Sequence, residues 1–208
     1  ALYNVLKAYS YCDATIGYCQ GMSDIAGLIL MYLDEEDAFW LLKQVCHDPR
    51  FGMRELFGNE LAAVRVCYFV HSEIIKDKLP MLHRHMRDQR VVASVYTTEW
   101  YMRVFLKVVN VNLAIRIWDV MLYEGYDILF TIALCILKQL KTRILSMTFY
   151  GIMSLLTNQL KQDGIINIDA LMRDVRASKL DANYLKSLKS RFLVKKNSCS
   201  GLMNPLVS

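Results

Sequence analysis

Proline and glycine are scarce in this sequence, with 3 prolines and 9 glycines among 208 residues. A sandwich or barrel of many short strands needs frequent turns, and these two residue types supply much of that turn chemistry. Their scarcity argues against such folds and favours helices. The length fits one ordinary domain, and no stretch rich in proline, glycine or serine divides the chain. We predict a single all-α unit.

Strong charge of one sign and long hydrophobic runs are also missing. Lysine and arginine number 25 against 20 acidic residues, and this mild excess does not predict a nucleic-acid partner. The longest apolar stretches, 25–33 and 128–137, fall well short of the roughly 18–20 residues that span a bilayer. We therefore expect no transmembrane segment. With 54% hydrophobic and 22% charged residues, the chain is also too apolar for intrinsic disorder.

The cysteines form no C-x-x-C motif, and most of them lie in apolar helical runs, where a free thiol packs as a small hydrophobic group. This usage indicates a reducing compartment, so we predict a cytoplasmic protein. The six are Cys12, Cys19, Cys46, Cys67, Cys135 and Cys199.

Much of the basic excess lies near the end of the chain, interleaved with leucines. It is carried by Arg173, Arg176, Lys179, Lys186, Lys189, Arg191, Lys195 and Lys196. A solvated helix face is the simpler interpretation. Contact with an acidic partner or peripheral association with an anionic membrane surface is the alternative.

Hydrophobic periodicity and capping residues predict a series of helices. Asp34 and Asn59 are predicted N-caps, Pro80 opens a helix, Asn112 caps another and Gly125 ends it. The segment 22–33 is apolar on nearly every side and is predicted to be a helix buried all round. The predicted helices are 2–9, 22–33, 35–48, 60–78, one from residue 80, 94–109, 112–124, 126–140, 148–162, 167–177 and 182–195, with a polar loop over 12–21.

Two clusters have residue types that bind metals. The acidic run 34–37 has the composition of a magnesium site in all-α prenyl-diphosphate enzymes, but consecutive carboxylates at a helix start fan around the axis. Helix capping is the simpler interpretation, and a metal-dependent prenyl or lipid enzyme is the alternative. Cys67 and His71 share a helix face without a third or fourth ligand. We predict no metal site.

The loop before residue 22 is the most unusual feature. It contains Gln20 between Gly17 and Gly21, and the glycines permit a tight turn and close approach of another backbone. A glutamine there carries both a donor and an acceptor and could project outward. Alternatively, Gln20 caps the following helix.

The segment 17–22, Gly-Tyr-Cys-Gln-Gly-Met, strongly resembles the Y-x-Q motif of TBC domains, which are GTPase-activating modules for Rab proteins. The helix 2–10 resembles the one that leads into that motif, and 34–40 resembles the acidic start of the next helix. Residues 96–100 and 116–120, closed by 124–125, match the third motif region. The resemblance covers about 2–162, and the nearest subgroup is the one that includes Evi5 and RN-tre.

The resemblance implies a single multi-helix orthogonal bundle without a sheet. It assigns 1–165 to the C-terminal two-thirds of a TBC domain and 166–208 to peripheral helices and the tail of the same unit. By this match Gln20 is the catalytic glutamine that positions the attacking water on the GTPase. The residues that bind the GTPase or position the loop are Gly17, Tyr18, Cys19, Gly21 and Met22.

Four further residues of the third motif region are expected to support the structure. Trp118 is expected to anchor the core. If Asp119 is buried it needs hydrogen-bond partners, and we predict that it organises the neighbouring loop or the segment that carries the family's arginine. The four are Trp100, Arg116, Trp118 and Asp119.

TBC proteins also supply an arginine, from an I-x-x-D-x-x-R motif that lies upstream of Leu2 in the family pattern. The chain starts at Ala1 in helical pattern and contains no such motif, so it reads as a piece of a longer protein. We expect these residues alone to be nearly inactive, since an arginine finger contributes about 10³–10⁵ in rate. The resemblance thus implies a regulator rather than an enzyme, without a cofactor of its own, because GTP and Mg²⁺ belong to the GTPase.

The expected partner is a Rab-type GTPase in the GTP state, which could recruit the protein to endomembranes. The alternative function is a non-catalytic adaptor that binds a Rab through the same surface.

Overall fold

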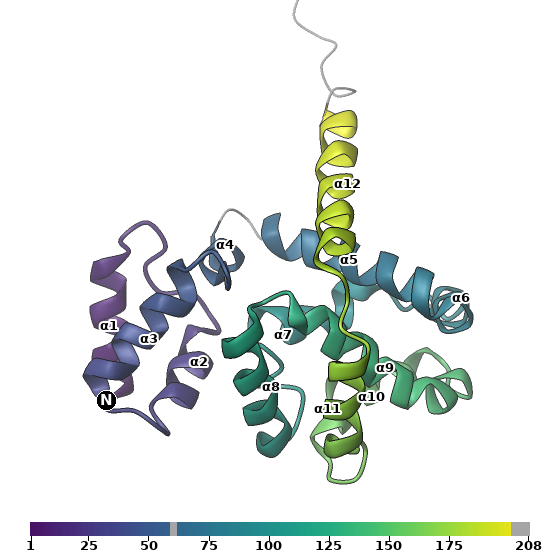
Figure 1. The fold of residues 1–208 in the computed structure, drawn as a ribbon, viewed down its shortest axis with the longest axis horizontal. Helices are drawn as coiled ribbons and strands as arrows, with labels where there is room; N and C mark the ends of the chain where they lie inside the picture. The colour runs from purple at the N-terminus through teal and green to yellow at the C-terminus, as the bar shows by residue number, and fades with distance from the viewer. Residues whose placement is uncertain (59–61, 201–208) are drawn as a thin grey trace, which may run out of the picture.

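The computed structural model describes residues 1–58 and 62–200, with side chains described as far as Lys195. Helices joined by turns make up this part of the chain, without a strand, which confirms the all-α prediction (Figure 1). Asn59 and the side chains of Lys196 and Cys199 lie outside the described residues. In chain order the elements are α1 Leu2–Cys12, α2 Met22–Ile29, α3 Glu35–His47, α4 Met53–Phe57, α5 Ala62–Lys78, α6 Pro80–Asp88, α7 Ala93–Met102, α8 Val111–Glu124, α9 Ile128–Leu145, α10 Phe149–Thr157, the 3-10 helix η2 Gln159–Lys161, α11 Ile168–Ala177 and α12 Ala182–Ser200.

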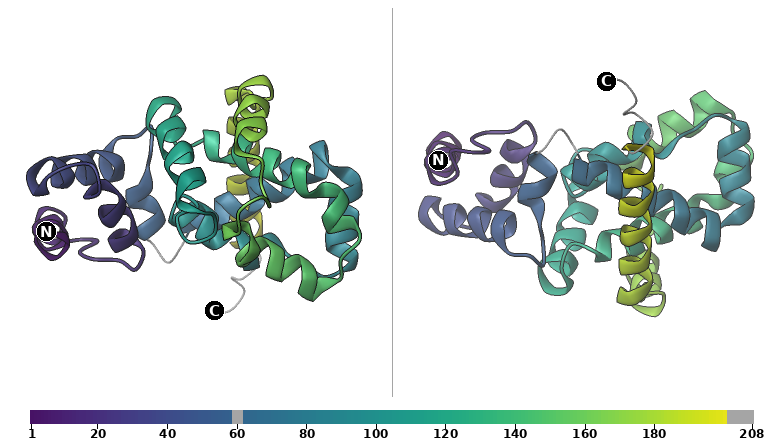
Figure 2. Two further views of the ribbon diagram at one scale, coloured as in Figure 1. Left: turned by 90° about the horizontal axis from the view of Figure 1, so that it is seen from below. Right: turned by 90° about the horizontal axis from the view of Figure 1, so that it is seen from above.

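The helices form two groups that meet near α4 (Figure 1). The small group consists of α1–α4, and α1 packs on both α2 and α3. The large group consists of α5–α12, where α9 packs on α5, α6, α8 and α11, and α12 lies across α5 (Figure 2). Every residue of 128–137 is buried, so the first half of α9 forms the middle of the large group. None of the helices in the described ranges is long and apolar enough to cross a lipid bilayer.

A backbone contact joins the two groups at the end of α8. The Tyr126 N–H donates to the Arg50 carbonyl oxygen at 2.9 Å. Gly125 has φ +90°, and a Cβ there would lie 3.1 Å from the same oxygen, so glycine is required by both conformation and space. Gly125 ends α8, as the sequence predicts.

Other local signals are also confirmed. The Asp34 carboxylate accepts a hydrogen bond from the Asp37 N–H at 3.0 Å, and Pro80 begins α6. Glu35 instead accepts from Asn4 at 2.8 Å. The acidic run 34–37 is thus committed to the start of α3, and no three metal-binding side chains converge within the described ranges.

The prediction of a helix over 22–33 that is buried all round is wrong at its end. α2 stops at Ile29, and the chain turns over the next four residues to begin α3. Met31 and Tyr32 lie at this turn and are each 63% exposed. The apolar sequence therefore extends beyond the helix into a turn whose side chains remain exposed, and hydrophobicity alone does not mark the end of α2.

The predicted helix 94–109 also ends early, at Met102. Val104 and Phe105 follow with φ of 47° and 64°, a left-handed conformation that β-branched and bulky residues rarely adopt. Both side chains are fully buried, so packing holds the backbone in this conformation. A propensity argument has no means of predicting this turn.

Smaller corrections concern the ends of elements. Asn110, not Asn112, caps α8, because its side-chain oxygen accepts from the Leu113 N–H at 2.9 Å. The predicted helix 148–162 divides into α10 and η2, and the predicted helix 126–140 runs from 128 to 145. α4 has five residues, too few for periodicity to predict it.

His71 is buried among aromatic side chains of the large group. Its two ring nitrogens each lie 2.7 Å from a tyrosine hydroxyl, Nδ1 from Tyr101 and Nε2 from Tyr96. In the neutral ring one nitrogen donates and the other accepts, so both positions are used. Cys67 Sγ lies 3.9 Å from the Tyr126 hydroxyl. The pair that could have shared a metal is thus engaged in tyrosine contacts.

Burial lowers the pKa of His71 to about 3, from 6.5. Below pH 6.5 the unfolded chain therefore binds a proton that the folded chain does not, and stability falls as pH falls. We expect the free energy of unfolding to drop by about 2 kcal/mol between pH 6.5 and 5 on account of this residue. Urea titrations across this range measure the slope, which His71→Gln should reduce. His83→Gln, on the partly exposed side of α6, is the variant with which the slope of His71→Gln is compared.

Candidate functional site: the Gln20 loop

Gln20 lies on the loop that joins α1 to α2. Its side chain is exposed and makes no hydrogen bond to any other described residue. α2 begins directly after Gly21, and no side chain caps it. The alternative in which Gln20 caps α2 is therefore wrong, and its amide is free to interact with another molecule.

The glycines on either side of Gln20 both adopt left-handed backbone conformations. Gly17 has φ +62° and Gly21 has φ +106°, values that residues with a Cβ rarely take. At Gly21 there is a second constraint, because a Cβ would lie 3.2 Å from Arg103 Nε and 3.3 Å from Arg103 Cγ. Glycine therefore occurs at positions 17 and 21 because the loop backbone is left-handed at both.

Asp13 fixes the first end of the loop. Its buried carboxylate accepts hydrogen bonds from Arg54 Nε and from Arg54 Nη2, the latter at 3.0 Å, which ties the loop to α4. It also accepts from the Ile16 N–H at 3.3 Å, and His47 Nε2 lies 3.6 Å away. The Arg54 hydrogen bonds, and to a smaller degree that of Ile16, hold the pKa of Asp13 below its usual value, so the clamp stays charged at neutral pH.

The middle of the loop is braced by the first turn of α2. The Tyr18 hydroxyl donates to Ser23 Oγ at 3.3 Å while more than half of its side chain stays exposed. The Cys19 N–H points to the sulfur of the buried Met22 at 3.3 Å, and the Met22 N–H returns a hydrogen bond to the Cys19 carbonyl. The loop therefore presents Tyr18 and Gln20 to solvent from a held backbone.

The second end of the loop contacts the large group. Arg103 Nε lies 3.4 Å from Asp24 Oδ2, and Arg103 Nη1 lies 2.9 Å from Glu99 Oε2. Lys107 Nζ lies 2.8 Å from Asp24 Oδ1. None of these residues was predicted to belong to the site. The sequence contains one indication of these contacts: Arg103 and Lys107 are two positive charges within an otherwise apolar stretch.

The tryptophans of the third motif region are buried. Trp100 is fully buried and donates from Nε1 to the Leu156 carbonyl at 3.2 Å. Trp118 is buried too, and its Nε1 has no hydrogen-bond partner in the described part of the chain.

Arg116 and Asp119 lie on the exposed side of α8. If Asp119 were buried, it would need partners, but it is exposed and makes no hydrogen bond or ion pair with another described residue. The buried face of α8 is formed by Leu113, Ala114, Ile117, Trp118 and Met121. Asp119 points elsewhere because it follows Trp118 on a helix whose buried stripe recurs every three or four residues.

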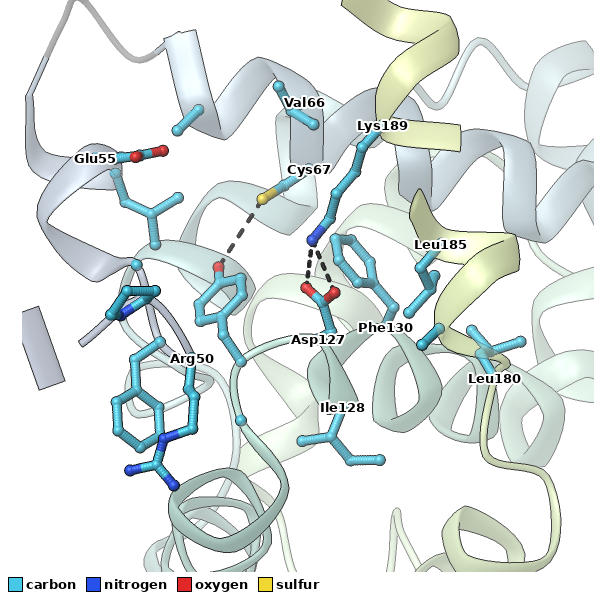
Figure 3. Close-up of a pocket in the computed structure, with 18 of the residues that line it drawn as sticks. Arg50, Glu55, Val66, Cys67, Asp127, Ile128, Phe130, Leu180, Leu185 and Lys189 are labelled. Carbon is cyan, nitrogen blue, oxygen red and sulfur yellow. Dashed lines mark hydrogen bonds and ion pairs between the residues drawn. The ribbon is translucent and has the colours of Figure 1, made fainter. Parts of the chain in front are cut away.

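A pocket lies away from the Gln20 loop, between α4, α5, the start of α9 and α12 (Figure 3). It has a volume of about 880 Å³. Lys189 Nζ lies 2.6 and 2.8 Å from the two carboxylate oxygens of Asp127, and Lys179 pairs with Glu124. Its lysines are thus already neutralised within the chain, and we assign no ligand to it.

The same contacts account for part of the basic run near the C-terminus. Lys179 and Lys189 pair as described, and Arg191 Nη2 lies 2.8 Å from Glu73 Oε2. These ion pairs attach α12 and the segment before it to the other helices of the large group. Neither interpretation of the basic run predicted this role.

Comparison with known proteins identifies the family of the chain. A family model for the Rab-GTPase-TBC domain matches residues 1–145. The chain belongs to the Rab-GTPase-TBC domain family. The resemblance found in the sequence is thereby confirmed, and the Gln20 loop lies within the matched residues.

Individual TBC relatives agree with this assignment. The ecotropic viral integration site 5 ortholog of Drosophila melanogaster is 30% identical over 192 residues, which are 92% of this chain and 24% of that protein. The Rab GTPase-activating protein eat-17 of Caenorhabditis elegans is 30% identical over 195 residues, 94% of this chain and 22% of that protein. The chain thus spans about a quarter of the length of these curated relatives.

A solved TBC domain has the same fold. The flagellar RabGAP TBC domain of Chlamydomonas superimposes with a TM-score of 0.72 and 30% sequence identity, over 85% of this chain and 58% of that chain. The agreement covers an all-α arrangement, in line with the helices described above.

Proposed function

We propose that this TBC chain stimulates GTP hydrolysis on a Rab-type GTPase by placing Gln20 beside the attacking water. The observation that carries the proposal is an exposed glutamine without a hydrogen-bond partner among the described residues, on a loop whose two ends are clamped, in a chain of this family. A fixed amide that can both donate and accept is suited to orienting a water molecule. GTP and Mg²⁺ would be carried by the GTPase, so the chain would need no cofactor of its own.

Hydrolysis also needs positive charge near the transferring phosphoryl group. We propose that an arginine from an I-x-x-D-x-x-R segment upstream of Leu2 supplies it. Residues 1–208 alone would then bind the GTPase and stimulate it weakly. Binding to a Rab would bring the protein from the cytoplasm to endomembranes.

A non-catalytic Rab-binding adaptor is the second candidate, favoured by the lack of an I-x-x-D-x-x-R arrangement in the 208 residues. Phosphate release from a panel of GTP-loaded Rabs, measured with the full-length protein, separates the two. We expect at least one Rab to be stimulated, and the stimulation to require Gln20. The same panel loaded with a non-hydrolysable GTP analogue measures binding.

Binding without stimulation would favour the adaptor. Neither binding nor stimulation with any Rab would overturn both functions.

A further inference from the structure

We propose that Arg103 is a positioning residue for Gln20. It holds Gly21 and Asp24 against the large helix group and so fixes the direction in which the loop presents the glutamine. The inference deepens the proposed function and rests on it, because the position of Gln20 matters for hydrolysis only when a GTPase is bound.

The contacts of Arg103 surround the residue that follows Gln20. The side chain packs so closely on Gly21 that a Cβ there would meet both its Cγ and its Nε. Its guanidinium reaches in two directions, to Glu99 of its own helix group and to Asp24 in the first turn of α2. Since Gly21 is the last residue before α2, this contact restrains the backbone directly after Gln20, where the helix begins.

The segment that carries Arg103 is itself rigidly held. Val104 and Phe105, which follow directly, are fully buried and keep left-handed backbone conformations. The Phe105 ring packs on Trp100 with a centroid separation of 5.0 Å. Such conformations persist only where the surroundings determine them, so Arg103 projects from a backbone with little freedom to move.

The other clamp of the loop cannot replace this contact. Asp13 is held by Arg54, and both belong to the small group. That clamp fixes the loop relative to α4, whereas Arg103 ties it to α7 in the large group. If a GTPase contacts both groups, the orientation of Gln20 relative to the GTPase is fixed only while the Arg103 contacts are intact.

Lys107 shares Asp24 with Arg103 but differs from it in burial. The Arg103 side chain is 15% exposed, and that of Lys107 is 50% exposed. Lys107 pairs with Asp24 alone, and the three atoms nearest to a Cβ at Gly21 all belong to Arg103. Because exposed ion pairs contribute little, Lys107 offers a matched control in which one charge of the same cluster is lost.

The first test compares Arg103→Met with Lys107→Met in the full-length protein, acting on a Rab that it stimulates. Methionine keeps much of the side-chain length and removes the charge. We expect Arg103→Met to lower kcat by about 10-fold with KM for the Rab within about 2-fold, since positioning acts in the transition state. Lys107→Met should stay within about 2-fold of wild type in both constants.

A double-mutant cycle shows whether the effect passes through Gln20. In a Gln20→Ala background, Arg103→Met should cause less than about a 2-fold further loss of kcat. An equal loss in both backgrounds would mean that Arg103 acts on the fold or the GTPase independently, and would overturn the inference.

Hydrogen exchange of the same full-length variants tests the restraint without any GTPase. The amides of residues 22–25 should exchange about 10-fold faster in Arg103→Met, while those of α9 keep their protection. Asp24→Asn, which removes the charge partner at nearly constant volume, should act in the same direction. Unchanged exchange at 22–25 in both variants would overturn the inference. Faster exchange with no Gln20-dependent stimulation on any Rab would instead retain the restraint and reject the proposed function.

Discussion

On the proposed function, Gln20→Ala is expected to lower stimulated GTP hydrolysis by the full-length protein by about 10²–10³-fold, the cost of removing one preorganised polar group from a reacting centre. The amide is exposed and makes no hydrogen bond to any other described residue, so its loss removes none of the described contacts. We therefore expect the free energy of unfolding to change by less than about 0.5 kcal/mol. Single-turnover phosphate release and urea titration measure the two quantities.

Gln162→Ala is the matched control, because Gln162 is also exposed and follows η2 in the large group. It should leave both hydrolysis and stability unchanged. Gln20→Asn tests whether hydrolysis depends on the length of the side chain, since this variant keeps the amide and removes one methylene. Full stimulation by Gln20→Ala would show that another group positions the water.

Trp100→Ala is expected to lower the free energy of unfolding by about 3–5 kcal/mol. The side chain is fully buried, with ring centroids of Tyr96 and Phe105 at 5.3 and 5.0 Å. Its removal opens a large cavity and leaves the Leu156 carbonyl without the Nε1–H donor. Urea titration of residues 1–208 at pH 7.5, where His71 is neutral in both states, measures the loss.

Trp40→Ala provides the comparison within the same chain. Trp40 lies on α3 and is 53% exposed, so its removal creates no closed cavity and should cost less than about 1 kcal/mol. Similar losses for the two tryptophans would contradict the packing described for Trp100.

The fold was predictable where the signal is local. Asp34, Pro80 and Gly125 each mark an element boundary through their own side chain or backbone preference, and each lies where predicted. The prediction failed where tertiary packing decides the conformation. The left-handed turn at Val104 is such a case, and its sequence looks like more helix.

The site was predictable in part for the same reason. The glycines and Gln20 are adjacent in the chain, so their spacing and the family motif identify the loop. Its clamps join residues far apart in sequence: Asp13 and Arg54 are separated by 41 positions, and Arg103 lies in another helix group. No pattern within one segment predicts such pairs. That Asp119 organises the neighbouring loop or the segment that carries the family's arginine stays a prediction, to which the structure adds that the side chain is exposed.

The two helix groups touch at positions where the chain has only a hydrogen in place of a side chain, Gly125 against Arg50 and Gly21 against Arg103. A larger residue at either position would force the groups apart or distort the backbone. The groups also pack through α4, which contacts both α5 and α7, so the two glycines set how closely the groups approach at two points of a larger contact. Exposed residues around Gln20, such as Tyr18, make no contact at either point. Substitutions of the exposed residues around Gln20 would therefore leave both contacts in place and keep the position of the glutamine.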